Sequence, residues 1–480
     1  MILVVDVGTS SVRSALVDDH ARIVDEATEA TLPASPAPGL VEFDAHELAA
    51  AALRTARAVL DGAPAPVAAV GIANQRGSTV LWDRAPGEPV GPGLGWQDLR
   101  TIGRCLELRA DGLRLAPNVS ATKIEHLLDR VDPDRTGDLC FGTVDSWITW
   151  VLSEGALHVS DASNAGLTGL RVADGSEWDE SALDLLRIPR ALLPRVVDSS
   201  GVVGLASALP GAPPIAGLAG DQQASLLGQG GVHAGDAKIT FGTGGMLDLV
   251  LGDERPGFAS RGGAGTFPIV CRQVAGRITW GVEAIMLSAG TNVEWLRDDL
   301  GVIESAAASH EVAAQCTDTG DVWFVPALLG LGTPRWDYGA RGTVLGLTRG
   351  TGRPELVRAV LEGVAHRGAD LLEAAEADSG IAIPRIRVDG GMSANPTFVQ
   401  ALADAAQRPV EVSPVLEATA LGAAFLAGIA VGTWPDEAAV AGIVQPRTRV
   451  DPARTLDRTR WREACHRAAH WIPDLSAVDF

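Results

Sequence analysis

Short apolar runs alternate with longer amphipathic stretches along the chain. The apolar run at 2–5 ends at Asp6, a turn of small residues follows, and a second apolar run covers 12–17. Strand, small-residue turn and strand in this order predict a β-hairpin. A phosphate loop of the GxxxxGK[ST] type must instead open a helix, and no such motif occurs in the sequence.

Helical and strand patterns then follow one another to the end of the chain. The predicted helices cover 46–60, 101–109, 120–130, 354–377, 396–406 and 418–430, and the predicted strands include 67–73 and 386–388. Strands that alternate with helices indicate an α/β fold with buried sheets. The last of these helices, ATALGAAFLAGIA, consists of small apolar residues, so we expect it to pack very close to a neighbour.

The opening hairpin pattern returns near the middle of the chain. After the Gly-rich stretch at 228–235, a strand at 237–241 leads into Gly242-Thr243-Gly244-Gly245 and another apolar run at 246–251. Two such hairpins indicate a duplicated domain with a cleft between the copies. Chance similarity of two glycine turns is the alternative, which the matching strand context disfavours. We place the boundary near residue 229, with domains at 1–228 and 229–480.

Composition and charge narrow the class of protein. Hydrophobic residues make up 46% of the 480 residues and charged ones 21%, which allows large cores and excludes global disorder. The net charge of −21, from 60 acidic and 39 basic residues, argues against a nucleic acid or an anionic membrane as the main partner. A small anionic ligand held by backbone amides stays compatible with this charge.

Cysteine spacing and the chain start bear on the compartment. The five cysteines are scattered without CxxC or CxxH spacing, which suits a reducing cytosol and disfavours disulfides or a zinc site. The N-terminus lacks a basic segment before its apolar run, and no apolar run reaches the ~18–20 residues of a membrane span. We therefore expect a soluble, cytoplasmic protein; whether it forms a homo-oligomer stays open.

Lysine is almost absent from this chain. Only two of the 39 basic residues are lysines, Lys123 and Lys238. A genome that favours arginine codons is the simplest explanation of the bias. It still makes the two remaining lysines more interesting than lysines usually are.

The two predicted hairpin turns suit phosphate groups. Backbone N–H groups and small hydroxyl side chains converge there on one point, and Asp6 at the end of the preceding strand could hold Mg²⁺ through water. A simple tight turn is the alternative for the first motif alone. The second turn favours a site in which the two turns hold a polyphosphate between them.

Three further segments carry candidate chemistry. Asp221, in GDQQ just before the predicted boundary, could take a proton from a substrate hydroxyl or could merely cap a helix. The loop at 389–396 could receive adenine or ribose, or be a plain strand-to-helix loop. Arg76 could donate two hydrogen bonds to substrate hydroxyls, or be a surface charge. Trp96 could offer an apolar surface to a carbon chain, or equally well be a core residue.

A series of motifs resembles the FGGY carbohydrate kinases, and within them most closely the glycerol kinases. The motifs run in order from about residue 2 to 433: DVGTSSVRSALVD, VAAVGIANQR, WQDLRT, LCFGTVDSWITW, HVSDASNA, IPRALLPRVVDSS, IAGLAGDQQASLLGQ, AKITFGTG, VPALLGLGTPRWDYGARGTVLGLTRG, IRVDGGMSANPTFVQ and EATALGAAFLAG. This resemblance implies two RNase H-like domains of the actin/hexokinase ATPase type, with ATP and Mg²⁺ in the cleft between them.

The resemblance also implies roles for particular residues. Asp221 matches the general base and, with Asp6, the acidic side chains near Mg²⁺. The nucleotide would contact Thr9, Ser10, Ser11, Arg13, Thr243, Gly244, Gly391 and Asn395. The substrate pocket would be formed by Arg76, Gly77, Trp96, Asn118, Asp221, Gln222 and Met246.

The pocket departs from the glycerol kinase pattern at three positions. Gly77 stands where those enzymes carry Glu, Asn118 where they carry Tyr, and Met246 where they carry Phe. Losing a buried acceptor and two rings alters the recognition of a hydroxylated substrate. We expect Gly77 and Asn118 to leave room and polarity for a longer or differently oriented polyol or ketose.

The sequence thus predicts an ATP-dependent kinase that phosphorylates a hydroxyl of a small polyol or sugar. A glycerol kinase that makes glycerol 3-phosphate with a remodelled pocket is one alternative. A non-catalytic nucleotide-binding regulator on the same fold is another, disfavoured because both Asp221 and Asp6 are present.

Overall fold

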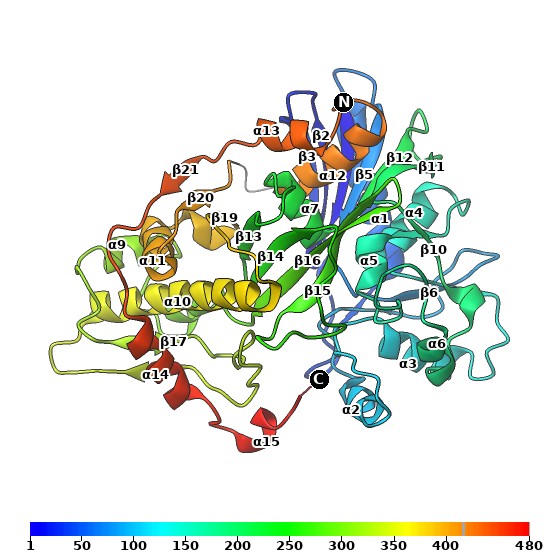
Figure 1. The fold of residues 1–480 in the computed structure, drawn as a ribbon. Helices are drawn as coiled ribbons and strands as arrows, with labels where there is room; N and C mark the ends of the chain where they lie inside the picture. Colours follow the sequence, from blue (N-terminus) through cyan, green and yellow to red (C-terminus); the bar gives the residue numbers. More distant parts are fainter. Residues whose placement is uncertain (415–417, 480) are drawn as a thin grey trace.

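One continuous sheet passes through the whole molecule (Figure 1). The computed structural model describes residues 1–414 and 418–479, and its main sheet has 13 strands in the order β21-β20-β19-β13-β14-β16-β15-β11-β12-β5-β1-β2-β3. The first half contributes β1 (Ile2–Val7), β2 (Ser11–Val17), β3 (Ile23–Ala30), β5 (Ala69–Asn74), β11 (Ser200–Leu205) and β12 (Pro214–Gly220). The second half contributes β13 (Ala237–Phe241), β14 (Gly245–Gly252), β15 (Phe267–Val274), β16 (Arg277–Met286), β19 (Ile386–Asp389), β20 (Val410–Val412) and β21 (Thr448–Val450).

The two halves repeat one pairing scheme. In the first half β1 is antiparallel to β2, β2 is antiparallel to β3, and β1, β5 and β12 are parallel. In the second half β13, β14 and β16 form the antiparallel part, while β13, β19 and β20 are parallel. The duplication inferred from the two glycine turns is therefore present in the strand order. The two parts of the sheet meet where Ser200 of β11 pairs with Val274 of β15.

Both predicted hairpins are confirmed, and the predicted helices lie close to their expected bounds. The main helices of the first half are α1 (Ala45–Asp61), α2 (Ile102–Ala110), α3 (Ala121–Val131), α4 (Val144–Leu152), α5 (Ala162–Gly166), α6 (Glu180–Leu185) and α7 (Asp221–Gly228). Those of the second half are α8 (Thr291–Glu294), α9 (Ala308–Ala313), α10 (Arg353–Ser379), α11 (Pro396–Ala406), α12 (Ala418–Ala430), α13 (Glu437–Ile443), α14 (Arg458–Ala468) and α15 (Pro473–Ser476). None of the helices in the described part of the chain has the length and apolarity that a membrane span requires.

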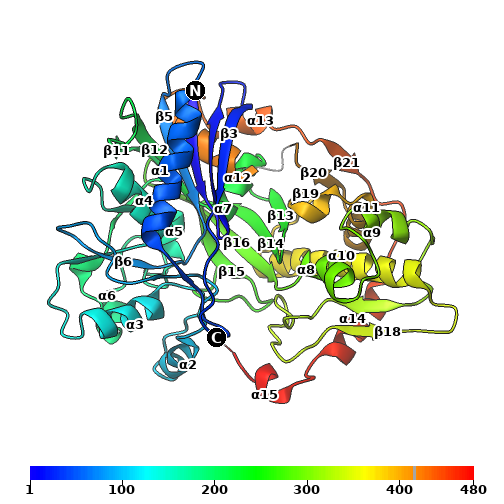
Figure 2. The same ribbon diagram turned by 180° about the vertical axis from the view of Figure 1, so that it is seen from behind.

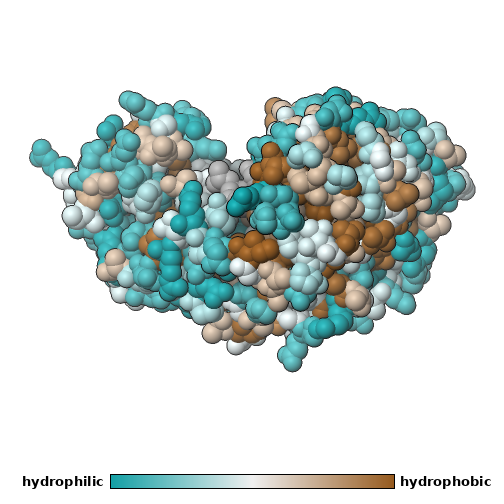
Figure 3. Space-filling model, turned by 90° about the horizontal axis from the view of Figure 1, so that it is seen from above, coloured by the Kyte–Doolittle hydropathy of each residue, from teal (hydrophilic) through white to brown (hydrophobic). Residues whose placement is uncertain are grey.

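Two lobes flank the centre of the sheet. Seen from behind, α1 lies against the sheet of the first half, and the helices of the second half gather on the other side of the molecule (Figure 2). The space-filling view from above shows a hollow between the two lobes (Figure 3). Separate hydrophobic cores fill the two lobes, one around β1, β5 and α1 and the other around β13, β14 and α10.

Helix α12 joins the two halves through very close packing. A Cβ atom at Gly422 would lie 1.8 Å from the carbonyl oxygen of Ala224 in α7, and one at Gly228 would lie 1.8 Å from that of Ala418. The other side of α12 meets the first half's sheet, where a Cβ at Gly71 would lie 2.3 Å from the oxygen of Ala423. The sequence prediction of a closely packed small-residue helix is confirmed. Its neighbours are α7 and the strands of the first half.

Replacing Gly422 by alanine should open this joint. The added methyl group has to push α12 away from α7, so we expect the free energy of unfolding to fall by about 1–3 kcal/mol. Gly442→Ala in α13 is the matched control, because a Cβ there meets nothing within 4 Å. That change should raise stability by up to about 1 kcal/mol through helix propensity. Denaturant unfolding measures both, and equal effects would contradict the packing argument.

Candidate active site

The carboxyl ends of three parallel strands bring the candidate residues to one edge of the first half's sheet. Asp6 of β1 pairs with Ala73 of β5, and Asn74 of β5 pairs with Gly220 of β12. At ~4.8 Å between strands, β1 and β12 are about 10 Å apart, and Asp6 is level with Ala219, two residues before the first residue of the helix that follows β12. That residue is Asp221. Ligands of open α/β sheets bind at this edge.

A buried polar network fixes the ends of β5 and β12. The side chains of Asn74 and Asn164 exchange two hydrogen bonds, of 2.9 and 3.0 Å, and Asp161 accepts from Asn164. Ser163 Oγ accepts from the backbone N–H of Gly220 at 3.0 Å. Because these groups are fully buried and mutually bonded, they hold the strand ends in one geometry.

Asp221 is the first residue of α7 and faces an accessible space. The helix N-cap is Gly220, whose position gives no side-chain cap, so the interpretation of Asp221 as an N-cap is wrong. Its Oδ1 accepts from the Gln222 N–H at 2.8 Å and lies 3.4 Å from Arg76 Nε. The side chain is 32% exposed, which lets a substrate reach it. Burial raises the pKa of this carboxyl, and the charge of Arg76 opposes that rise.

Arg76 crosses from the first half to the second. It follows β5, its side chain is 11% exposed, and its Nη2 donates to Glu283 Oε2 of β16 at 2.6 Å. The same nitrogen lies 3.7 Å from Met246 Sδ. The alternative of a surface charge is therefore wrong. Burial raises the pKa of Glu283 to about 7, against the attraction of Arg76.

Gly77 is a constrained position. Its φ is +70°, and a Cβ there would lie 2.4 Å from the Asn118 carbonyl oxygen and 3.7 Å from Trp96 Cβ. The expectation that Gly77 leaves room is wrong along the side-chain direction, because the Asn118 backbone fills that space. The Asn118 side chain itself is exposed. That Asn118 in place of Tyr leaves space for a larger substrate therefore stays a prediction.

Trp96 connects the pocket to the first turn. Its indole N–H donates to Thr9 Oγ1 at 3.1 Å, and its backbone N–H donates to Ser78 Oγ at 3.0 Å. The side chain is half-buried, unlike the fully enclosed core residue that was the alternative. A ring in this position borders both the hydroxyl-rich turn and Gly77.

The two turns have the predicted form. In the first, the Gly8 N–H donates to the Ser11 oxygen at 2.9 Å and Ser10 is exposed, while Arg13 pairs with Asp6 across the hairpin. In the second, Thr243 is exposed and its oxygen accepts from the Ala289 N–H at 2.9 Å. A Cβ at Gly244 would lie 2.7 Å from the Met286 oxygen, so this turn packs directly on the end of β16.

The loop after β19 contains a helix cap. Asn395 Oδ1 accepts from the Phe398 N–H at 3.1 Å and caps α11, while its Nδ2 donates to Ser309 Oγ at 2.9 Å. Gly391 is exposed, with nothing within 4 Å of a built Cβ. Asn395 thus shapes the loop, and only Gly391 of the two presents open backbone.

Glu283 and Asp248 were not predicted from the sequence, and Lys238 was given no role. Lys238 and Asp248 are both buried, with Nζ 2.8 Å from Asp248 Oδ2. Acidic residues inside the strand patterns 245–252 and 277–286 were the available signal, because carboxylates are rarely buried without a partner.

The acidic residues suit Mg²⁺ bound together with phosphates. The described residues contain no group of three or more His, Cys, Asp or Glu side chains that could hold a metal alone. Mg²⁺ needs only one or two carboxylates when substrate phosphates and water complete its shell. Asp6 and Asp221, at one sheet edge beside a hydroxyl-rich turn, fit that requirement.

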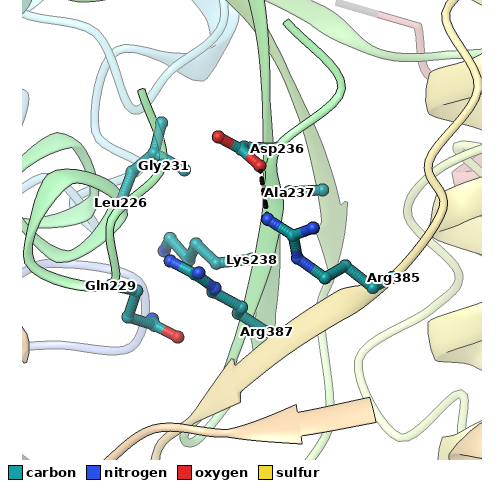
Figure 4. Close-up of a pocket in the computed structure, with 8 residues that line it drawn as sticks. All are labelled: Leu226, Gln229, Gly231, Asp236, Ala237, Lys238, Arg385 and Arg387. Atoms are coloured by element: carbon teal, nitrogen blue, oxygen red, sulfur yellow. Dashed lines mark hydrogen bonds and ion pairs between the residues drawn. The ribbon is translucent and has the colours of Figure 1, made fainter. Parts of the chain in front are cut away.

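A separate small cavity lies at the other end of α7 (Figure 4). It is lined by Leu226, Gln229, Gly231, Asp236, Ala237, Lys238, Arg385 and Arg387. Asp236 and Arg385 form an ion pair of 3.1 Å across it. Since Gln229 follows α7 and Asp221 begins it, this cavity is distinct from the candidate active site.

Comparison with known proteins identifies the class that this fold and site define. The family models for the N-terminal and C-terminal domains of the FGGY family of carbohydrate kinases match residues 1–228 and 237–431. The chain therefore belongs to the FGGY carbohydrate kinases. As a member it is an ATP-dependent phosphotransferase that uses Mg²⁺, and the predicted two-domain fold of the actin/hexokinase type is confirmed.

Individual relatives are similar over their full length. A glycerol kinase of Halorhodospira halophila is 43% identical over 98% of this chain and 97% of its own. Glycerol kinase 2 of Thermotoga maritima is 39% identical over 98% and 99%. A Plasmodium falciparum glycerol kinase structure with ADP has a TM-score of 0.90 at 26% identity, over 100% and 99%. A Brucella ovis xylulose kinase structure has 0.86 at 25%, over 99% of each chain.

Lys123 contacts the backbone of Gly77 and Asn118 and should have an unusually low pKa. Its buried Nζ lies 3.2 Å from the Asn118 oxygen and 3.4 Å from the Gly77 oxygen, and burial lowers its pKa from 10.5 to about 7. Protein labelled with [ε-¹³C]lysine has only two lysine signals, because the chain has two lysines. We expect the signal that Lys123→Met removes to titrate near pH 7.

The same shift sets a pH dependence of stability. Between about pH 7 and 10.5 the unfolded chain holds a proton that folded Lys123 has lost. The free energy of unfolding should therefore gain a positive contribution as pH rises through this window. Lys123→Met should remove that contribution. A Lys123 signal that titrates only near pH 10.5 would contradict the burial of the Lys123 charge.

Proposed function

We propose that this FGGY kinase phosphorylates a primary hydroxyl of a polyol or ketose with four or five carbons. The observation that carries the proposal is that all three departures from the glycerol kinase pattern lie at Arg76 or at its chain neighbour Gly77. Gly77 adjoins Arg76 in the chain, the Asn118 carbonyl contacts Gly77, and Met246 Sδ lies 3.7 Å from Arg76 Nη2. Three changes at one pocket fit a changed substrate better than independent drift.

Asp221 serves as the general base in this proposal. Its Oδ atoms are reachable, and its raised pKa gives the carboxylate more affinity for the hydroxyl proton. Arg76 lies beside it and orients the substrate oxygens, while Gln222 offers its side-chain amide. As the proton moves to Asp221, the hydroxyl oxygen becomes the nucleophile for the phosphoryl group.

The nucleotide occupies the space between the two turns. Backbone N–H groups and hydroxyls of Thr9, Ser10, Ser11, Thr243 and Gly244 hold phosphate oxygens, and Arg13 lies behind the first turn. Gly391 and Asn395 border the adenosine part. Mg²⁺ held by Asp6 and Asp221 through water would neutralise phosphate charge. The division of domains at 228/229 and a cytoplasmic location remain predictions.

Glycerol is the second candidate substrate. Its support is that relatives 39–43% identical over 98% of this chain are named glycerol kinases. The chain also carries Arg76, Trp96, Asp221 and Gln222, which the resemblance associates with glycerol. The two candidates differ only in which substrate fills the altered side of the pocket.

A coupled ADP-release screen with MgATP separates the candidates. We expect kcat/KM to be highest for a tetritol, a pentitol or the corresponding ketose, because two lost rings widen the pocket around Arg76 and Met246. Glycerol on top of the ranking would overturn the primary proposal in favour of the second candidate. ATP hydrolysis without acceptor provides the baseline.

Asp221→Asn should abolish most turnover. The amide has nearly the same shape but accepts no proton, so we expect kcat to fall by roughly 10²–10⁴-fold. Binding of ADP without Mg²⁺, measured by calorimetry, should change little because the nucleotide itself lies on the two turns and not on Asp221. Unchanged kcat in this variant would remove Asp221 as the base.

A matched pair at Gly77 tests the missing acceptor. Both Gly77→Glu and Gly77→Gln meet the same strain at φ +70° and the same Asn118 oxygen, so their ratio isolates the carboxylate. We expect kcat/KM for glycerol to be about tenfold higher in Gly77→Glu than in Gly77→Gln, the value of a charged hydrogen bond. Equal values would show that an acceptor at 77 does not select glycerol.

A further inference from the structure

The two lysines of this chain are both buried against the proposed substrate pocket. Lys238 of β13 is fully buried, although lysine is among the residues least often enclosed. The chain uses arginine at all but two of its 39 basic positions, so a lysine at this place is not interchangeable with the prevailing residue. The surroundings of Lys238 explain why.

Three acceptors surround the Lys238 ammonium. Nζ lies 2.8 Å from Asp248 Oδ2 and 2.9 Å from Thr240 Oγ1, and it also donates to Gln222 Oε1. An ammonium group has three N–H donors and no acceptor; it donates to Thr240 and Gln222 and forms an ion pair with Asp248. The planar five-donor fork of arginine does not match three acceptors around one point.

The contact with Gln222 determines which way its amide faces. Because Lys238 can only donate, the Gln222 atom beside it has to be the carbonyl oxygen. The NH₂ group of Gln222 then points to the other side of the amide. Within the described part of the chain, that group contacts no protein acceptor, and the side chain is only half-buried.

We propose that Lys238 is a positioning residue that holds the Gln222 amide with its NH₂ group toward the substrate. This inference rests on the proposed function, since it assigns Gln222 a donor role toward a polyol or ketose oxygen. Asp248 supplies the countercharge that lets Lys238 stay buried. Lys238 also lines the small cavity beyond α7 (Figure 4).

Substitution of Gln222 by Glu is the sharpest test of the amide's direction. The carboxylate still accepts from Lys238 but has no N–H to offer the substrate, so the fold should be retained and the substrate donor lost. We expect KM for the best polyol or ketose to rise about five- to tenfold, as in Gln222→Ala. The KM for MgATP should change less than twofold. An unchanged polyol KM in Gln222→Glu would overturn the proposal.

A double-mutant cycle tests whether Lys238 acts through Gln222. Lys238→Met combined with Asp248→Asn removes both buried charges together, because removing one alone leaves the other unpaired and destabilises the fold. This pair should raise the polyol KM as Gln222→Ala does, and adding Gln222→Ala should raise it no further. Multiplied effects, or no effect of the pair, would show that Lys238 has only a structural role.

Lysine NMR judges the contact independently of turnover. In [ε-¹³C]lysine protein, Gln222→Ala should shift the Lys238 signal and leave the Lys123 signal in place. If the unmodified enzyme turns over no compound of the screen, the proposed function fails while this signal still reports the contact. A Lys238 signal that ignores Gln222→Ala would overturn the positioning role even in an active enzyme. This measurement can also be made if the Lys238→Met/Asp248→Asn variant does not fold, because it uses only the unmodified protein and Gln222→Ala.

Discussion

The contact between α7 and α12 sets the geometry on which the rest of the molecule depends. The two helices approach until backbone meets backbone, which requires Gly228 and Gly422 at the crossing. Helix α7 begins with Asp221 and ends where the chain passes to the second half, while α12 returns from the second half to cover the first half's sheet. The candidate base is therefore part of the joint between the lobes. Any relative movement of the lobes that bends this joint also moves the carboxylate.

Most of the fold could be predicted from the sequence because its signals are local. Apolar runs, glycine turns and the small-residue pattern of α12 each reflect the backbone within a few residues, and the second hairpin indicated the duplication. The continuity of the sheet through β11 and β15 could not be predicted, since it depends on a pairing between segments far apart in the chain. The packing of α12 on the strands of the other half is a long-range feature of the same kind.

The site shows a similar division. Asp221, Arg76 and Trp96 stand in recognisable segments; the structure pairs Arg76 with Asp221 and places Trp96 beside the first turn and Gly77. Glu283 and Asp248 escaped notice, and Lys238 was noticed but given no role, because their importance comes from charges that meet across strands. Gly77 was misjudged for a related reason: an absent side chain suggests space, but a neighbouring carbonyl occupies it. Residue identity tells which groups are present, whereas only the tertiary structure tells what lies beside them.

The burial of Lys123 and Lys238 has a consequence for the chemistry of the surface. Both lysine ammonium groups of the chain are enclosed, so the folded molecule presents only arginines as cationic side chains apart from histidine. Acylating reagents find no lysine side chain at the surface, so apart from the N-terminal amine they react with amines only when the pocket region opens. The rate at which Lys123 and Lys238 become acylated thus measures how often that region unfolds locally.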